Sequence, residues 1–327
     1  MDIMDILKAY SHDVDAQIEN ILSTLEPEEL RESSIYLTRA GGKKIRPALT
    51  MLSCQAVSGS TEKSINAAVA IELIHTFSLI HDDIMDNDDT RRGLAAVHKV
   101  WGEPTAILAG DTLFAKAYES LLLTAEDNIP YAKVLDSLKI LVDACINICE
   151  GQVLDMSFED TFDVERSQYT HMIYQKTGAL ITAATTIGAI IGGATELQIE
   201  GLRKYGENIG IAFQIQDDYI DLTGDDSIGK PVGSDLVEGK KTIMVLYALE
   251  KATPEDHDRL IELLEANDES IIDEAMELLN KYGAINYAKI AAYDHIIKAK
   301  EALGVLPESE AKDILKKLAN YVYNRKV

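Results

Sequence analysis

Cysteine and proline are scarce in this 327-residue sequence, and aromatic residues make up only 6% of it. The first two scarcities bear on the compartment and on the fold. Three cysteines are too few for a disulfide-stapled scaffold and fit a reducing compartment, so we expect a cytoplasmic protein. Seven prolines leave long segments available for helices. No stretch reaches ~20 uncharged apolar residues, so the sequence predicts no membrane span.

Basic residues are also in deficit, because 31 Lys and Arg stand against 55 Asp and Glu, a formal net charge of −24. This charge repels the phosphates of nucleic acids, so we expect no nucleic-acid partner. It repels a free diphosphate as well. A phosphate site in this chain therefore needs local cations or metal ions.

Apolar residues are abundant, at 46% of the chain, and they recur with helical spacing in segments rich in Ala, Leu, Ile, Glu and Lys. The pattern predicts an all-α fold. It continues without a linker or a shift in composition, so we expect one domain over residues 1–327. Two breaks, at residues 87–104 and 224–241, contain glycine and proline and interrupt the helices.

The first break follows an aspartate cluster in the sequence IHDDIMDNDDTRRG. Asp82, Asp83 and Asp86 form a DDxxD motif at the end of an apolar helix. Asp82 and Asp86 are four residues apart, so their carboxylates lie one turn apart on one face. Mg²⁺ prefers oxygen ligands and commonly bridges one or two carboxylates to substrate phosphates. Taken alone, the motif is equally compatible with a solvated acidic helix end.

A second DDxxD motif, in IAFQIQDDYIDL, favours the metal-binding interpretation. Gln214, Asp217, Asp218 and Asp221 follow the spacing i, i+3, i+4, i+7 and form one stripe of a helix. Such a stripe is normally apolar and buried. A polar stripe on an otherwise apolar helix is typical of a wall that faces a wet, metal-filled cavity.

Cations stand where a phosphate enzyme requires them. The segment GGKKIRP places Lys43, Lys44 and Arg46 after two glycines, which let the backbone approach an anion closely. His75 lies seven residues before Asp82 on the same helix face, where it can donate to a diphosphate or simply be part of the core. Other cations lie beside glycine turns or aspartate clusters, and each alone would be an ordinary surface residue: Arg91, Arg92, Lys176, Lys230, Lys240 and Lys241.

The motifs GGKKIRP, HDDIMDNDDTRRG, YQKTG, FQIQDDYIDL, GKPVGSDL and GKKT resemble those of the trans-prenyl diphosphate synthases, in the same order, over about residues 40–245. This family includes the farnesyl, geranylgeranyl and longer polyprenyl diphosphate synthases. The resemblance implies an all-α fold of the isoprenoid synthase type, a single large helical bundle around a deep central cavity. It also implies a homodimer and three Mg²⁺ ions per active site.

The resemblance also assigns roles by motif position. It implies metal ligation by Asp82, Asp86 and Asp217, supported by Asp83, Asp218 and Asp221. The residues implied for the allylic diphosphate are Arg91, Lys176, Thr177, Gln214, Lys230 and Lys240. Those implied for isopentenyl diphosphate are Lys43, Arg46, His75 and Arg92.

The implied reaction is the Mg²⁺-dependent head-to-tail (1'-4) condensation of isopentenyl diphosphate with dimethylallyl, geranyl or farnesyl diphosphate. A terpene cyclase shares the first DDxxD but does not need the set formed by Lys43, Arg46 and His75. A metal-dependent HD phosphohydrolase would use His81 and Asp82, but the seven histidines are scattered without supporting ligand pairs. A non-catalytic regulatory subunit tends to lose its aspartate motifs, and both are intact here.

The growing product must extend from its diphosphate along the helix that precedes the first DDxxD motif. We therefore expect residues one to two turns before Asp82 to decide where growth stops. These residues are Ile74, Phe77 and Ser78. Only Phe77 is large and rigid, although a helical wheel places it well around from Asp82, so plain core packing stays an alternative. An aromatic residue five positions before DDxxD resembles the geranylgeranyl-forming type. We therefore expect C20 geranylgeranyl diphosphate, with farnesyl or longer diphosphates as alternatives.

Overall fold

A computed structural model describes residues 3–159, 161–224, 232–266 and 268–325. The chain divides into two compact units. The first contains Met1–Cys145, Leu180–Gly206 and Ala302–Lys317, and the second contains Ile146–Ala179, Glu207–Glu301 and Leu318–Val327. The prediction of one domain over residues 1–327 stays a prediction.

The all-α prediction is confirmed, since the described residues contain many helices and only two strands, each of two residues. The first unit contains α1 (Ile3–Leu22), α2 (Glu28–Arg39), α3 (Ile45–Ser58), η1 (Glu62–Ser64), α4 (Ile65–Met85), β1 (Thr90–Arg91), β2 (Leu94–Ala95), α5 (Val97–Trp101), α6 (Glu103–Leu123), η2 (Thr124–Asp127), most of α9 (Ala179–Gly192) and η6 (Leu303–Val305). Helices α9 and α15 (Ala284–Ala302) each have one terminal residue in the other unit, and three longer divisions fall within α7 (Tyr131–Glu159), α10 (Glu196–Thr223) and α16 (Glu310–Asn324).

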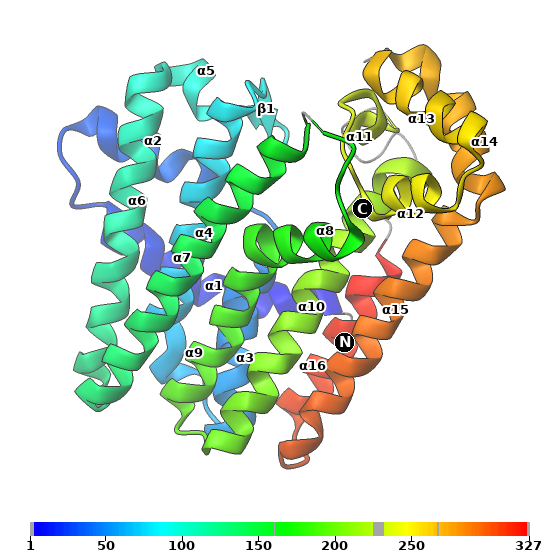
Figure 1. Cartoon of the computed structure of the whole chain (residues 1–327). Coiled ribbons are helices and arrows are strands. Elements are labelled where there is room, and N and C mark those ends of the chain that lie inside the picture. Colours follow the sequence, from blue (N-terminus) through cyan, green and yellow to red (C-terminus); the bar gives the residue numbers. More distant parts are fainter. Residues whose placement is uncertain (1–2, 160, 225–231, 267, 326–327) are drawn as a thin grey trace. The chain divides into compact units, whose positions relative to one another are not determined.

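Helix α4 is central to the first unit, because it packs against α1, α3 and α6 (Figure 1). By length and composition alone, the segment Glu62–Met85 is apolar enough to cross a membrane, but 61% of its most apolar window is buried inside the protein. This degree of burial is typical of a helix in the core of a folded unit. Helix α4 ends at the first DDxxD motif, so the core fixes the direction from which these aspartates emerge.

The break predicted at residues 87–104 contains a tight hairpin. Strand β1 pairs antiparallel with β2, and Arg92 and Gly93 connect them with φ values of 53° and 76°. Positive φ at both central residues is what a type I′ turn requires. Arg91 lies in β1, directly before the turn, and Arg92 is the first residue of the turn.

The second unit contains α8 (Arg166–Ile173), η3 (Tyr174–Gly178), α11 (Ser234–Val237), α12 (Ile243–Lys251), α13 (Pro254–Ala266), η5 (Glu269–Ile271), α14 (Ile272–Lys281) and α15 (Ala284–Ala302). Its apolar core includes Tyr169 from α8, Ile215 from α10 and Met244 from α12. Segment η3 is a π-helix, a local widening that is frequent at functional sites, and it covers the YQKTG motif. The widening directly follows α8 and sets the direction of Lys176 and Thr177.

The close approach of α9 to α3 gives a stability prediction. A Cβ atom on Gly188 would lie 2.2 Å from the Thr50 carbonyl oxygen and 3.0 Å from the Ser53 Cβ. Gly188→Ala should therefore lower the free energy of unfolding by roughly 1–3 kcal/mol through overpacking, measured by urea denaturation. Gly304→Ala is the matched control, because no atom lies within 4 Å of the added methyl group, and it should be near neutral. Equal stability of the two variants would contradict the close packing.

Candidate active site

The middle aspartate of the first DDxxD motif is a buried anchor. Asp83 accepts a hydrogen bond from Arg91 Nε at 2.6 Å and pairs with Arg91 Nη2. Arg91 also donates to Asp88 at 3.0 Å, which ties the hairpin to the end of α4. Burial raises the pKa of the Asp83 carboxyl, while the contact with Arg91 opposes the rise. The side chain of Asp83 is thereby committed to positioning Arg91.

The outer aspartates of this motif are more accessible. Asp82 is half-buried and Asp86 is exposed, one helical turn apart at the end of α4. Within the described ranges, no three His, Cys, Asp or Glu side chains converge in a preformed metal cluster. Two accessible carboxylates fit Mg²⁺, which uses one or two carboxylates together with substrate phosphates and waters.

His75 lies between cations, on the same helix as the motif. Burial lowers its pKa well below the ordinary value, and Arg46, Arg92 and Lys44 lower it further. Arg46 Nη1 lies 3.2 Å from His75 Nε2. Since a guanidinium only donates hydrogen bonds, Nε2 must accept, which leaves the imidazole neutral with its hydrogen on Nδ1. Any donation to a diphosphate from the neutral ring therefore comes from Nδ1.

Arg92 contributes mainly to the local framework. Its guanidinium donates to the Gly41 carbonyl at 2.5 Å and to the Leu37 carbonyl at 3.2 Å. Gly42 has φ 130°, which side chains rarely adopt, and a Cβ there would lie 3.1 Å from the Arg92 Cζ, so the guanidinium would have to shift. Lys43 lies in the same turn and directly precedes Lys44, the N-cap of α3. The structure thus brings the glycine turn and the hairpin together through Arg92.

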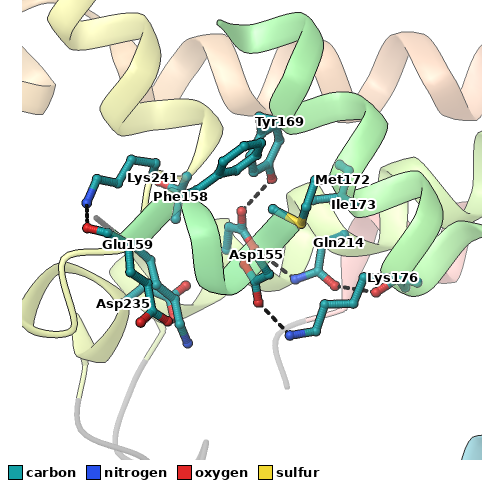
Figure 2. A pocket seen from close by; sticks show the side chains of 14 residues that line it. Asp155, Phe158, Glu159, Tyr169, Met172, Ile173, Lys176, Gln214, Asp235 and Lys241 are labelled. Atoms are coloured by element: carbon teal, nitrogen blue, oxygen red, sulfur yellow. Dashed lines mark hydrogen bonds and ion pairs between the residues drawn. The ribbon is translucent and has the colours of Figure 1, made fainter. Parts of the chain in front are cut away.

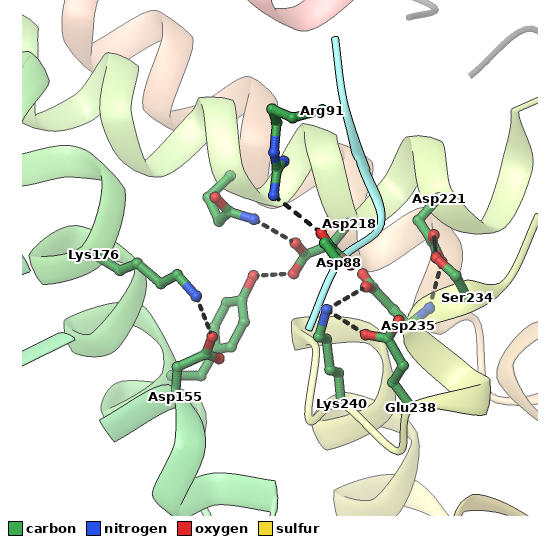
Figure 3. A network of polar contacts seen from close by, with 12 residues as sticks. Asp88, Arg91, Asp155, Lys176, Asp218, Asp221, Ser234, Asp235, Glu238 and Lys240 are labelled. Carbon is green, nitrogen blue, oxygen red and sulfur yellow. Dashed lines mark hydrogen bonds and ion pairs between the residues drawn. The ribbon is translucent and has the colours of Figure 1, made fainter. Parts of the chain in front are cut away.

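The polar stripe of α10 is held from several sides in the second unit (Figure 3). Tyr169 donates to Asp218 at 2.5 Å, and Gln214 donates to its other oxygen at 2.9 Å. Thr177, from the π-helix, donates to Gln214 at 2.9 Å. Burial raises the pKa of Asp218 to about 8 and nearby Asp235 adds to this rise, while the two hydrogen bonds oppose it. Asp218 is the buried counterpart of Asp83.

A cavity of about 110 Å³ lies against this network (Figure 2). Lys176 enters it from the π-helix and pairs with Asp155 of α7 at 2.5 Å. Lys240 also lines it and contacts Asp235 at 3.3 Å and Glu238 at 2.7 Å. Burial lowers the pKa of Lys240, but Asp235 and Glu238 raise it by more. The net pKa lies above the ordinary value, so the ammonium stays charged. Lys241 lines the cavity as well and donates to the Glu159 carbonyl at 2.7 Å. The cavity thus offers three cations for an anion, two of them paired with carboxylates.

The other two aspartates of the second motif have separate partners. Asp217 keeps 43% of its side chain exposed and pairs with Arg325 at 2.5 Å. Asp221 accepts from Ser234 Oγ at 2.6 Å and from the Asp235 amide at 3.1 Å, which fixes the N-terminus of α11. Asp217 and Asp221 are both half-buried, whereas the middle residue, Asp218, is buried.

Several supporting residues were missed by sequence reasoning. Tyr169, Asp155 and Asp235 lie outside the two DDxxD motifs, and only their contacts with predicted site residues identify them. Glu72 gave a usable signal, because it is the one acidic residue within the apolar run of α4 before the motif. Predicted Lys230 lies outside the described residues.

Comparison with known proteins assigns the family. The polyprenyl synthetase family profile matches residues 27–281. A short chain isoprenyl diphosphate synthase from Methanothermobacter thermautotrophicus is 51% identical, covering 99% of both chains. A geranylgeranyl diphosphate synthase from Methanosarcina mazei is 44% identical, covering 99% of this chain and 98% of its own. A geranylfarnesyl diphosphate synthase from Natronomonas pharaonis is 40% identical over 95% and 94%.

Solved structures agree with the sequence comparison. The crystal structure of a geranylgeranyl pyrophosphate synthetase from Pyrococcus horikoshii matches with a TM-score of 0.93 and 43% identity, covering 99% of this chain and 98% of its own. The match confirms the predicted fold as the all-α isoprenoid synthase fold. The chain belongs to the polyprenyl synthetase family.

Proposed function

We propose that this protein condenses isopentenyl diphosphate head to tail (1'-4) with an allylic diphosphate and releases diphosphate. The observation that carries the proposal is that the two DDxxD motifs have the same arrangement of buried and accessible aspartates. Each has a buried middle aspartate, Asp83 or Asp218, held by hydrogen bonds, and at least one accessible outer aspartate. The similarity to named prenyl diphosphate synthases over nearly the full chain supports it.

Three Mg²⁺ ions per active site, held through Asp82, Asp86 and Asp217, would supply electrostatic stabilisation of the diphosphate that departs. The chain's own cations would stabilise the rest of the negative charge on the diphosphate. Lys176 and Lys240 line one cavity and would hold the allylic diphosphate, with Thr177 and Gln214 beside them. This places positive charge where negative charge grows as the allylic C–O bond breaks.

The second substrate would bind the cations of the first unit. Four side chains would hold the diphosphate of isopentenyl diphosphate so that its double bond faces the allylic cation: Lys43, Arg46, His75 and Arg92. Loss of a proton, to the departing diphosphate, then ends the cycle. No nucleophilic side chain is needed.

The product is proposed to be C20 geranylgeranyl diphosphate. Ile74 is fully buried, so the length determinants reduce to half-buried Phe77 and Ser78. The Phe77 ring packs edge-on against Phe114, with centroids 5.1 Å apart, and against His81 at 4.7 Å. These contacts hold the ring in place, as a chain-terminating floor requires. The relatives named for geranylfarnesyl products keep C25 as an alternative.

A homodimer in the cytoplasm is proposed as the working state. Helix α7 exposes an apolar stripe at heptad-like spacing, which a second copy can cover: Leu135, Val142, Ile146, Val153 and Met156. The three cysteines of the protein are free thiols, as a reducing compartment favours.

The direct test is an assay of the purified protein with labelled isopentenyl diphosphate, each of the three allylic primers and Mg²⁺. We expect C20 diphosphate as the main product and no product in EDTA. Release of cyclic hydrocarbon would indicate a terpene cyclase, and inactivity of the folded protein alone would indicate a regulatory subunit. A wild-type product of C40 or longer would refute the C20 assignment.

Metal dependence should be traceable to the accessible aspartates. Asp82→Ala or Asp217→Ala should each lower turnover by about 10²–10³-fold, because each removes charge stabilisation from the departing diphosphate. Circular dichroism should stay unchanged. Asp89→Ala, an exposed position in the same loop region, is the control and should retain activity. Near-wild-type turnover of either test variant would refute the metal assignment.

The two cationic groups should act on different substrates. Arg46→Ala should raise KM for isopentenyl diphosphate about tenfold, whereas Lys176→Ala should raise KM for the allylic substrate by a similar factor. Steady-state kinetics with each substrate varied in turn measures both values. If each variant changed the two KM values equally, the residue assignment would be wrong.

The floor proposal predicts longer products when Phe77 is truncated. Phe77→Ala should shift the product distribution from C20 to C25 or longer, because the ring no longer blocks the growing chain. Mass spectrometry of the dephosphorylated products measures the shift. Leu122→Ala, on the exposed face of α6, is the control and should leave the distribution unchanged. An active Phe77→Ala enzyme with an unchanged product would refute the floor.

A further inference from the structure

Two turns in the first unit adopt a backbone conformation that long side chains rarely take. Lys44 has φ 48° and ψ 37°, and Arg92 has φ 53°. Only two other described residues besides glycine, Asn87 and Asn128, have positive φ, and asparagine tolerates this region. Lys44 and Arg92 therefore need compensation from tertiary contacts.

Both side chains reach the same buried carboxylate. Lys44 Nζ lies 3.1 Å from Glu72 Oε1, and Arg92 Nη2 lies 3.8 Å from the same oxygen. The side chains of Glu72 and Lys44 are only 1% and 2% exposed. Their angles do not meet hydrogen-bond geometry, and within the described part of the chain neither atom has a hydrogen-bond partner. Lys44 also pairs with Asp15 at 3.1 Å, but the Asp15 side chain is half-exposed. Glu72 is therefore the buried ion-pair partner of Lys44.

The two turns carry the cations proposed to bind isopentenyl diphosphate. Lys43 directly precedes Lys44, and Arg46 lies in the first turn of the helix for which Lys44 is the N-cap. Arg92 crosses from the hairpin to the Gly41 carbonyl of the other turn. Glu72 lies one helical turn before His75 on α4 and contacts both segments.

We propose that Glu72 is a positioning residue that locks both cationic turns into a preorganised diphosphate subsite. It touches no substrate. Its charge offsets the mutual repulsion of Lys44 and Arg92 and holds both residues in their left-handed conformations. The inference rests on the proposed function only for the identity of the substrate.

The test variant is Glu72→Gln, which keeps the shape and removes the charge. We expect KM for isopentenyl diphosphate to rise about tenfold, while KM for the allylic substrate and kcat change less than about twofold. Glu119→Gln, the same change in an exposed pair with Lys116, is the control and should change nothing. Equal loss in all parameters, or no loss in a folded variant, would overturn the proposal.

A rescue separates positioning from general damage. Lys44→Gly adopts the left-handed conformation without strain, so Glu72→Gln/Lys44→Gly should recover most of the lost KM. Failure of this recovery would show that Glu72 does not act through the Lys44 turn. Should Glu72→Gln not fold, Glu72→Asp keeps the charge but shortens its reach, and the same selective rise in KM is expected.

Binding of inorganic diphosphate in EDTA, measured by calorimetry, makes the test independent of catalysis. Without metal, the aspartate motifs repel this anion, so binding reports the chain's cations. The difference between wild type and Glu72→Gln isolates the cationic turns, because Lys176 and Lys240 are the same in both proteins. Affinity should fall about tenfold in Glu72→Gln and not in Glu119→Gln. An inactive wild type would reject the proposed function and leave this comparison valid. Equal affinity of wild type and Glu72→Gln would reject the positioning role.

Discussion

The candidate site depends on the burial of ionisable side chains, each next to an opposite charge or a hydrogen-bond donor. A buried carboxylate is costly unless it is paired, and removal of one partner is more harmful than absence of the pair. Asp83 is held by Arg91, Glu72 by Lys44, and Asp218 by Tyr169 and Gln214. These buried groups fix the directions of the helices and turns that carry the accessible ones.

This arrangement explains how a protein with a net charge of −24 can bind diphosphates. The cations are concentrated locally and kept charged by neighbouring carboxylates, as Lys240 is by Asp235 and Glu238. The accessible aspartates, in turn, offer oxygen ligands for a metal. Local charge, and not the sum over the chain, decides which ligand the site can bind.

Much of this was predictable from sequence. The helical periodicity gave the fold class, and the spacing in both DDxxD motifs placed the outer aspartates on one helix face. The sequence could not separate Asp83 from Asp82, because that difference depends on Arg91, which lies in β1 and donates a hydrogen bond to Asp83. It could not identify Tyr169 or Asp155 either, since their roles arise only when α8 and α7 pack near α10. The motif position of Arg92 implies a substrate ligand, but it could not show that the guanidinium also donates to two backbone carbonyls.

The central claim is that, in each motif, the accessible aspartates bind metal and the buried middle aspartate is structural. Anomalous diffraction from crystals grown with Mn²⁺ and a non-reactive allylic thiolodiphosphate tests it directly. The account predicts manganese peaks coordinated by Asp82, Asp86 and Asp217, with Asp83 still bonded to Arg91. Manganese bound to Asp83 or Asp218, with Arg91 or Tyr169 displaced, would contradict it.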